Sequence, residues 1–424
     1  MELQTPKGTR DFPPEEKILK DRIVNTLKSV FELYGYAPLE TPILERYDVL
    51  ASKYAGGTEI LKETFKLKDQ GQRELALRYD LTVPFSRFIG MNLNLKMPFK
   101  RYQIGEVFRD GPVASARYRQ FTQCDVDVAG SSSLILEAEL VSIIYSAFKK
   151  LGMKCIVKFN NRKLLNEMLD YCGVEKSKQD GAILSIDKLG KFGIDAVKKE
   201  LKQQDISDDK ILKIVNLLII KGSNDEKIRQ LKNVMKKSNG LLEIEELLKF
   251  CSNLGLEPEF DFALARGLSY YTGTIIETFL EESSVKSAVC SGGRYDNMIG
   301  AFLGKGNYPA VGISFGLDRI YDALAEKEKT VSRTTAKLYI IPINTLNESM
   351  KICQKFRDAG INTDIDSMGS GPSKNLEFAN SLGIPFVAFI GKKELDEGKI
   401  KLRDMKSGNE EMVKFDDAVL SMKF

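Results

Sequence analysis

The sequence predicts an α+β fold: an antiparallel sheet with flanking helices, a helical insertion, and a small α/β domain at the C-terminal end. Residues 99–130 predict two strands around a loop that contains Gly111 and Pro112. Residues 171–250 are rich in Lys, Leu, Ile and acidic residues at helical spacing. Residues 337–405 alternate between strand and helix patterns. We therefore expect one domain over residues 1–326, with its insertion at about 171–250, and a second over residues 336–424.

The composition is typical of a soluble globular protein. The 424 residues are enough for two or three domains, and a net charge of +4 permits a nucleic-acid partner without arguing for one. No apolar run reaches the length of a membrane span and the first residues have no secretory pattern, so we expect a cytoplasmic protein without a membrane partner. The six cysteines form no CxxC pair, which favours reduced, buried thiols and predicts no bound metal.

The chain contains no histidine. This excludes an imidazole general base, a Ser–His or Cys–His nucleophile and a histidine-bound metal. Any chemistry must therefore rest on arginines, carboxylates, tyrosines, bound magnesium and positioning. Compositional drift in a proteome rich in Lys, Asn and Ile is the plain alternative explanation.

The two strands of residues 99–130 predict an unusual polar surface. Because side chains alternate along a strand, residues two apart share a face. An apolar core explains the other face, but arginines, an amide and carboxylates together suit a polyanion with a small zwitterion. The alternative is a solvated sheet face with scattered charges. The members of the polar face are Arg101, Gln103, Gly105, Val107 and Arg109 in the first strand, and Arg117, Arg119, Phe121, Gln123, Asp125 and Asp127 in the second.

The segments before this hairpin predict a helix, an edge strand and a second, smaller hairpin. Apolar residues at helical spacing mark residues 15–33, and Pro38 and Pro42 make residues 36–44 an edge or interface strand. This pair is either an ordinary packing unit or a dimer seam. Residues 64–77 predict the smaller hairpin. After it, Asp80 and Thr82 either converge on a cation such as an ammonium group or cap the helix at 83–89, and the local pattern favours the cap.

The lysines of the insertion could contact a phosphate backbone, but a solvated helix face is the simpler interpretation. Three features of the sequence follow the insertion. Arg266 lies in a predicted apolar strand at 260–279, where an arginine is costly unless it is paired. Gly292 and Gly293 permit the close approach of a ligand or backbone. Residues 309–320 predict a strand that leads into a helix, whose first turn carries Asp318 and Arg319 and whose end favours a phosphate.

Several motifs together resemble the class II histidyl-tRNA synthetases over nearly the whole chain. They are RGLSYYTG at 266–273, SGGRYD at 291–296, FR at 108–109 with RYRQF at 117–121, KGTRD at 7–11, LRYDLTVP at 77–84 and LGIPF at 382–386. The form of the RYDLTVP motif is similar to the eukaryotic-type branch. The resemblance implies the class II antiparallel sheet, a homodimer built around Pro42, a helical insertion and a C-terminal anticodon-binding domain. It also implies ATP with Mg²⁺, L-histidine and tRNA(His) as substrates.

The resemblance implies roles for individual residues. Arg109 would bind the α-phosphate and the substrate carboxylate, with the catalytic arginine, Arg266, on the other side. Phe121 would stack on adenine. The remaining roles are the outer phosphates for Arg117 and Arg319, the α-ammonium for Asp80, Thr82 and Gln123, and the imidazole for Asp127, Tyr270 and Tyr271.

Three departures accompany the resemblance: Ser269 stands where an Asp is usual, Ala116 where a Gly is common, and Gly111 where an acid is frequent. The alternatives are an inactive paralogue that regulates histidine biosynthesis, a synthetase for another amino acid of the subclass, and a pure RNA-binding module. The first would lack the anticodon domain and erode the RGLSYYTG motif. The last would not require Arg266.

Overall fold

The computed structural model describes residues 3–52, 61–113, 117–266, 270–304, 306, 308–328 and 332–422. The chain divides into two compact units. One comprises residues 1–10 and 22–326, and the other comprises residues 11–21 and 327–424. The six cysteines are free, as expected, and five of them are buried. In the described part of the chain, no helix combines the length and the hydropathy needed to cross a membrane.

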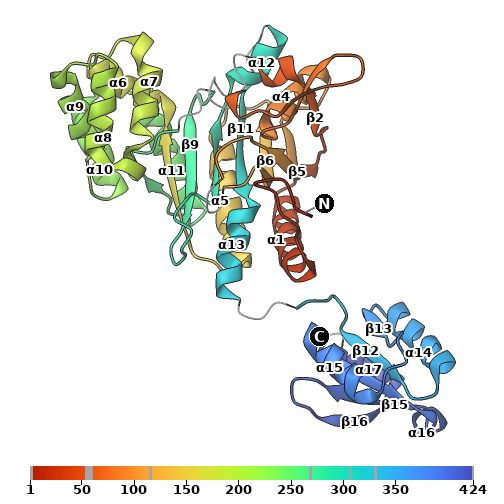
Figure 1. The fold of residues 1–424 in the computed structure, drawn as a ribbon. Coiled ribbons are helices and arrows are strands. Elements are labelled where there is room, and N and C mark those ends of the chain that lie inside the picture. Colours follow the sequence, from red (N-terminus) through yellow and green to blue (C-terminus); the bar gives the residue numbers. More distant parts are fainter. Residues whose placement is uncertain are drawn as a thin grey trace. The chain divides into compact units, whose positions relative to one another are not determined.

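The larger unit is built on a mostly antiparallel sheet of eight strands (Figure 1). The strands are β1 Ala37–Pro38, β5 Phe99–Phe108, β6 Gln120–Ala129, β7 Cys155–Asn161, β8 Glu259–Phe260, β9 Thr274–Leu280, β10 Cys290–Arg294 and β11 Ala310–Gly316. Their order in the sheet is β1-β5-β6-β11-β10-β9-β7-β8. The two edge strands, β1 and β8, are only two residues long.

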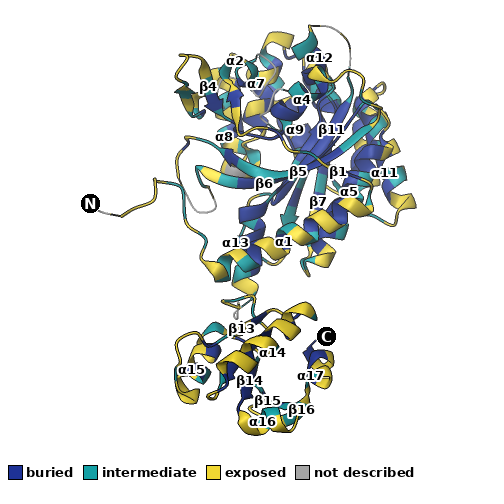
Figure 2. Ribbon diagram, turned by 90° about the vertical axis from the view of Figure 1, so that its right-hand side faces the viewer, coloured by how far each residue is buried: buried dark blue, intermediate teal, exposed yellow. Residues whose placement is uncertain are grey.

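The predicted hairpin forms the second and third strands of this sheet, beside the edge strand β1. β5 and β6 pair antiparallel over ten residues each, with Arg101 opposite Asp127 and Gly105 opposite Gln123. β11 pairs with the other side of β6 and places Gly312 opposite Asp127. The polar face of β6 is therefore flanked by an arginine on one side and a glycine on the other. Figure 2 shows β11, in the middle of the sheet, mostly as buried.

A second, three-stranded sheet and several helices surround the main sheet. The sheet contains β2 Leu44–Arg46, β3 Lys66–Lys68 and β4 Glu74–Leu77 in the order β2-β4-β3, so the predicted smaller hairpin is confirmed. The helices are α1 Pro14–Leu33, α2 Tyr47–Leu50, α4 Thr82–Met91, α5 Ile135–Lys150, α12 Asn297–Leu303 and α13 Leu317–Lys327. In α1, Ile23, Leu27 and Val30 are fully buried, as their helical spacing predicts. Pro38 lies in an edge strand, because proline cannot donate to a ladder on both sides.

Six helices between β7 and β8 form the insertion. They are α6 Arg162–Tyr171, α7 Lys176–Ile186, α8 Leu189–Gln203, α9 Asp208–Leu218, α10 Asn224–Val234 and α11 Asn239–Asn253. In Figure 1 the helices α6 to α10 gather at the β9 side of the sheet. α11 packs against β7 and α5, and α10 packs against β8. The insertion therefore rests on the far edge of the sheet from β5.

The predicted strand at 260–279 is wrong in its first half. β8 ends at Phe260, and the chain turns before β9 begins at Thr274. Asp261 starts the turn because its Oδ1 accepts a hydrogen bond from the Ala263 N–H at 3.1 Å. The buried Asn160 side chain donates to two carbonyl oxygens of the turn, Phe262 O at 3.0 Å and Leu264 O at 2.8 Å. Arg266 therefore follows a side-chain-supported turn and does not lie in a strand.

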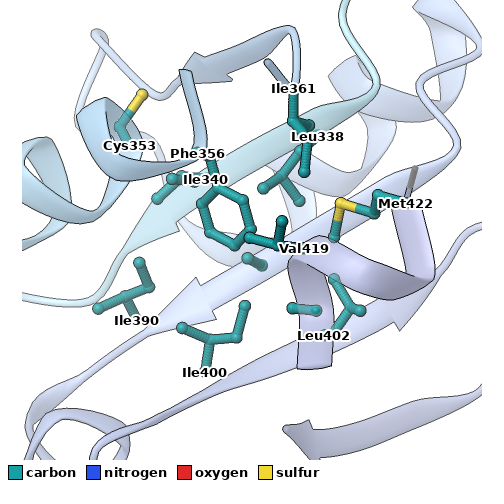
Figure 3. Close-up of a cluster of buried hydrophobic side chains, with 12 residues drawn as sticks. Leu338, Ile340, Cys353, Phe356, Ile361, Ile390, Ile400, Leu402, Val419 and Met422 are labelled. Atoms are coloured by element: carbon teal, nitrogen blue, oxygen red, sulfur yellow. The ribbon is translucent and has the colours of Figure 1, made fainter. Parts of the chain in front are cut away.

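The smaller unit has the predicted alternation of strands and helices. Its strands are β12 Leu338–Pro342, β13 Thr363–Ile365, β14 Phe386–Ile390, β15 Lys399–Asp404 and β16 Glu410–Lys414, in the order β13-β12-β14-β15-β16. Its helices are α14 Leu346–Asp358, α15 Pro372–Leu382, α16 Lys392–Asp396 and α17 Phe415–Met422. Figure 3 shows one of its cores, in which Phe356 lies among aliphatic side chains such as Ile340, Ile400 and Val419. A separate core gives this domain its own source of stability.

Candidate active site

The predicted polar face lines a cavity of about 440 Å³ with only part of its members. Those on β6 and at the adjoining chain ends line it, whereas the β5 side chains and Arg119 do not. Strands β6, β10 and β11 contribute to its lining, together with the turns that precede α4 and β9 and the start of α13. All the side chains that the sequence predicts for the site meet here. They are Asp80, Thr82, Arg109, Arg117, Phe121, Gln123, Asp127, Arg266, Tyr270, Tyr271 and Arg319.

Four arginines form one part of this lining. Arg109 Nε donates to Tyr79 O at 3.1 Å, and its guanidinium lies over the Phe121 ring at 5.1 Å. Arg319 Nη1 donates to Ala288 O at 2.7 Å. Burial lowers the pKa of Arg319, and the positive charges of Arg109, Arg266 and Arg117 lower it further. Because these four positive charges repel one another, the binding of an anion in the cavity is favoured.

Arg117 already has an anionic neighbour. Its Nη2 lies 2.8 Å from Oε1 of Glu63, and both side chains are partly exposed. The Glu63 carboxylate also lies over Gly111, since a Cβ added to that glycine would come within 2.8 Å of it. A carboxylate from a distant part of the chain therefore occupies the space beside Gly111, the position at which an acid is frequent in the motif that the sequence resembles. No pattern around Glu63 in the sequence indicated this role.

Arg266 reaches the cavity from the turn that Asn160 supports. Its Nη1 lies 3.3 Å from Oε1 of Glu277, and its guanidinium lies 5.5 Å from the centre of the Tyr271 ring. The Tyr270 and Tyr271 rings pack at 4.6 Å, and burial raises the pKa of Tyr271 so that its phenol stays protonated. The cost of burying this arginine is thus offset by a carboxylate and an aromatic ring.

Asp80 fits both hypotheses that the sequence left open. Its Oδ1 accepts from the Val83 N–H at 3.1 Å, which is the capping interaction at the start of α4. The same carboxylate lines the cavity beside Thr82 and is only 7% exposed. Burial raises the pKa of Asp80 to about 6, while the Val83 hydrogen bond and the charge of Arg109 oppose the rise.

Asp127 is held by the strands on both sides and by a tyrosine. Its Oδ2 lies 2.7 Å from Nη2 of Arg101, which is fully buried, and its Oδ1 accepts from the Tyr295 hydroxyl at 2.5 Å. A Cβ on Gly312 would lie 1.8 Å from the same Oδ1, so only glycine leaves room for this carboxylate. The sequence placed Arg101 on the polar face but assigned it no partner.

Three polar side chains on β6 are not fully hydrogen-bonded. Gln123 Nε2 donates to Ser314 Oγ at 2.9 Å. Within the described part of the chain, the buried atoms Gln123 Oε1, Asp125 Oδ1 and Asp127 Oδ2 have no hydrogen-bond partner, so the contact of Asp127 Oδ2 with Arg101 is an ion pair only. The sequence placed Asp125 on the polar face but gave it no role; Tyr295 was visible only as part of the SGGRYD motif. Two of the noted departures, Ser269 and Ala116, lie outside the described residues.

No resident metal site emerges from the described side chains. Among them, no group of three or more Asp, Glu or Cys side chains comes together in a way that could hold an ion. The lining of the cavity has a cationic part, made of the four arginines, and a carboxylate-rich part, made of Asp80, Asp125 and Asp127.

Comparisons with known proteins give the family. A family model described as histidyl-tRNA synthetase matches residues 8–320, and one described as an anticodon binding domain matches residues 337–423. A histidine–tRNA ligase 1 of Bacillus cereus (strain ZK / E33L) is 44% identical over 416 residues, covering 97% of each chain. A histidine–tRNA ligase of Bacteroides fragilis (strain YCH46) is 38% identical over 447 residues, covering 98% of this chain and 97% of the relative.

Comparison with solved structures gives the same result as the comparison of sequences. The crystal structure of histidyl-tRNA synthetase from Nostoc sp. PCC 7120 superposes with a TM-score of 0.89 at 32% identity, covering 100% of this chain and 99% of that one. A protein from Bacillus halodurans C, described as an ATP phosphoribosyltransferase regulatory subunit/histidyl-tRNA synthetase, has a TM-score of 0.76 at 22% identity, covering 90% and 97%, and shows the fold alone. These relatives are bacterial, so the predicted eukaryotic-type branch is not supported. The predicted class II fold with a C-terminal anticodon-binding domain is confirmed, and the chain belongs to the histidyl-tRNA synthetase family.

Proposed function

We propose that this protein is a histidine–tRNA ligase. It activates L-histidine with ATP to histidyl-adenylate, releases pyrophosphate, and transfers the histidyl group to tRNA(His). The observation that carries the proposal is the juxtaposition of an arginine cluster and a group of buried carboxylates in one cavity. An α-amino acid with an ammonium group and a nucleoside triphosphate together present the complementary charges.

The reaction needs no proton transfer from a side chain. A carboxylate oxygen of histidine attacks the α-phosphorus, and the bond to the bridging oxygen of pyrophosphate breaks. Negative charge on the phosphorus oxygens must be stabilised as they rearrange, and fixed arginines do this without reorganising. Arg109 and Arg266 contact the α-phosphate from two sides. This mechanism is consistent with a chain that has no histidine.

The other residues bind the two substrates. Phe121 stacks on adenine, Arg117 and Arg319 hold the outer phosphates, and Asp80, Thr82 and Gln123 bind the α-ammonium. Asp127, Tyr270 and Tyr271 surround the imidazole. Their common location on the cavity wall supports these assignments. Mg²⁺ enters with ATP as part of the substrate.

The remaining assignments extend the family resemblance. The catalytic domain comprises residues 1–326, with the insertion at about 171–250, and the anticodon-binding domain comprises residues 336–424; the two matched family models support this division. The protein acts in the cytoplasm as a homodimer with its seam around Pro42.

Amino-acid-dependent ATP–pyrophosphate exchange tests the activation step. We expect exchange with L-histidine and not with a panel of other amino acids, because a polar pocket rejects ligands that leave its groups unpaired. Arg266→Ala should lower the exchange rate about 100-fold or more, since it removes a charge that stabilises the transition state. The matched control is Arg46→Ala, which removes an exposed arginine paired with Asp48 outside the cavity. Absence of exchange with every amino acid from folded wild-type protein would favour the regulatory paralogue.

A further inference from the structure

The segment of residues 7–10, the first part of the KGTRD motif, has no role in the proposed reaction so far. The structure fixes it to the start of β6 through its backbone. Gly8 O accepts from the Arg119 N–H at 2.9 Å and from the Gln120 N–H at 3.4 Å. Gly8 has a φ of +85°, and a Cβ there would lie 2.8 Å from Cγ of Arg119. Glycine is therefore required at this position, and the segment is held beside the RYRQF motif.

Arg10, two residues further along the chain, contacts a carboxylate at the start of α13. Its Nη2 lies 3.4 Å from Oδ1 of Asp318, which is 6% exposed and lines the cavity. The other carboxylate oxygen of Asp318 accepts from the Thr122 N–H on β6 at 2.9 Å. Asp322, one turn further along α13, lies 4.0 Å from the same nitrogen of Arg10. Arg10 thus supplies positive charge to a carboxylate that connects α13 with β6.

The guanidinium of Arg10 also lies against two aromatic rings. Its central carbon is 4.6 Å from the centre of the Tyr118 ring and 5.5 Å from the centre of the Tyr321 ring. Both distances are within the range of a cation–π interaction. Tyr118 lines the cavity, whereas Arg10 is not part of its lining. Arg10 therefore contacts the wall of the cavity from behind.

The two cavity residues that Arg10 contacts are sequence neighbours of the arginines proposed to hold the outer phosphates of ATP. Tyr118 follows Arg117, and Asp318 precedes Arg319. The negative charge of Asp318 opposes the binding of a polyphosphate in this part of the cavity, so a positive charge beside it favours that binding. One side chain behind the wall thus acts on both elements that carry a phosphate-binding arginine.

We propose that Arg10 is a positioning residue for ATP. It neutralises Asp318 and holds the Tyr118 ring, and these two contacts keep the neighbouring arginines in place for the outer phosphates. The proposal rests on the proposed function, because it concerns the ATP part of the same site. Arg10 acts through its neighbours and not by contact with the phosphates. Its loss should therefore impair the use of ATP and leave the binding of histidine nearly unchanged.

The test is ATP–pyrophosphate exchange with the concentrations of ATP and histidine varied in turn. Arg10→Ala should raise the KM for ATP about fivefold or more, because it removes the positive charge beside Asp318, while the KM for histidine stays within about twofold. Arg10→Lys keeps a positive charge, so its KM for ATP should stay within about threefold of the wild-type value.

A second substitution distinguishes the neutralisation of charge from a loss of packing. Asp318→Asn removes the negative charge and keeps an oxygen that can accept from the Thr122 N–H. In the double variant with Arg10→Ala, the KM for ATP should therefore return to within about threefold of the wild-type value, which is a non-additive result. Asp318→Asn alone leaves the charge of Arg10 in place, so its KM for ATP should equal or fall below the wild-type value.

The matched control is Arg87→Ala. Arg87 Nη2 lies 2.6 Å from Oε1 of Glu45, a carboxylate that is 5% exposed, and neither residue lines the cavity. This variant also removes an arginine from a buried carboxylate. It should lose stability in urea unfolding, as Arg10→Ala does, and keep the wild-type KM for ATP.

The outcomes separate this inference from the proposed function. An unchanged KM for ATP in Arg10→Ala, or an equal rise in the KM values for both substrates, would overturn the inference and leave the ligase assignment intact. A double variant that is no better than Arg10→Ala would exclude the neutralisation of Asp318. Where Arg10→Ala fails to fold, a raised KM for ATP in Asp318→Asn alone would contradict the inference. Absence of exchange by the wild type with any amino acid would instead reject the proposed function.

Discussion

Single residues set the space and the charge of this cavity. Gly312 makes room for Asp127, while Glu63 lies over Gly111 and pairs with Arg117. Each of these contacts joins segments that are far apart in the chain. At this scale the site depends on the absence of a side chain at two glycines as much as on the charged groups themselves.

The Gly312 position predicts a strong effect from a single methyl group. A Cβ there would lie 1.8 Å from Asp127 Oδ1, so Gly312→Ala must displace the carboxylate or separate β11 from β6. We expect a loss of about 1–3 kcal/mol in unfolding free energy and a histidine KM raised about tenfold or more. Urea unfolding and exchange kinetics measure the two effects.

The control for this variant is Gly190→Ala, in helix α8, where an added Cβ has no neighbour within 4 Å. It should keep the wild-type KM and be as stable as the wild type or slightly more so, since alanine favours a helix. A normal histidine KM in Gly312→Ala would show that the carboxylate does not need its observed position.

Removing the charge of Glu63 should lower a KM, whereas Gly312→Ala should raise one. Its carboxylate pairs with Arg117, the residue proposed to hold an outer phosphate, so ATP must compete with it. Glu63→Gln keeps the shape and removes the charge. Because the pair is partly exposed, we expect the KM for ATP to fall by about twofold to fivefold with kcat nearly unchanged. Exchange kinetics at varied ATP measure this, and a raised KM for ATP would instead assign Glu63 to ligand binding.

At the scale of elements, a strand positions the turn that carries Arg266. Asn160 on β7 is fully buried and bonds two carbonyls of the turn, at Phe262 and Leu264. Asn224 on α10 holds the chain just before the same turn, since its side chain donates to Pro258 O and accepts from the Phe260 N–H. These two amides replace the ladder hydrogen bonds that a continuous strand would make.

The two amides predict different kinetic effects. Asn160→Ala leaves two buried carbonyls unpaired, so we expect a loss of about 1–3 kcal/mol in stability and a kcat for exchange lowered about tenfold or more. Asn224→Ala, the matched control, should lose stability by about 1 kcal/mol and keep its kcat, because its bonds end at Phe260. Equal kcat values for both variants would mean that the turn does not position Arg266.

At the scale of the whole molecule, the cavity and the domain matched by the anticodon-binding model are separate structures. Every residue that lines the cavity falls between Glu63 and Arg319, and the C-terminal unit has its own cores. The cavity is therefore complete without the anticodon-binding domain.

Removal of residues 336–424 should separate the two activities. We expect the shortened protein to retain histidine-dependent ATP–pyrophosphate exchange within about threefold, because the activation site keeps all its residues. Charging of tRNA(His) should fall about 100-fold or more, because the contacts to the anticodon are lost. Exchange and aminoacylation assays on the same preparation measure both, with circular dichroism as the control for folding. Loss of both activities from a folded protein would contradict this division of labour.

Local patterns in the sequence are sufficient for the elements and for the membership of the polar face. The spacing of Ile23, Leu27 and Val30 predicts α1, and strand alternation places Gln123, Asp125 and Asp127 on one surface. These inferences succeed because helix and strand periods are properties of neighbouring residues. The prediction of a strand through Arg266 is wrong for the same reason. The apolar pattern of that segment depends on neighbouring residues only, and it does not indicate the hydrogen bonds that Asn160 donates to the turn.

The sequence by itself determined the fold class, the two-part organisation and the side chains that meet in the cavity. Only the tertiary structure decided which of those charges are already paired. Strand register places Arg101 opposite Asp127, and β11 brings Gly312 against the same carboxylate, while Asp125 has no ion pair among the described residues. Glu63 likewise forms an ion pair with Arg117, although the two residues are far apart in the sequence. The physical reason is that pairing energy depends on distance and burial between segments, and neither quantity is a property of the local sequence.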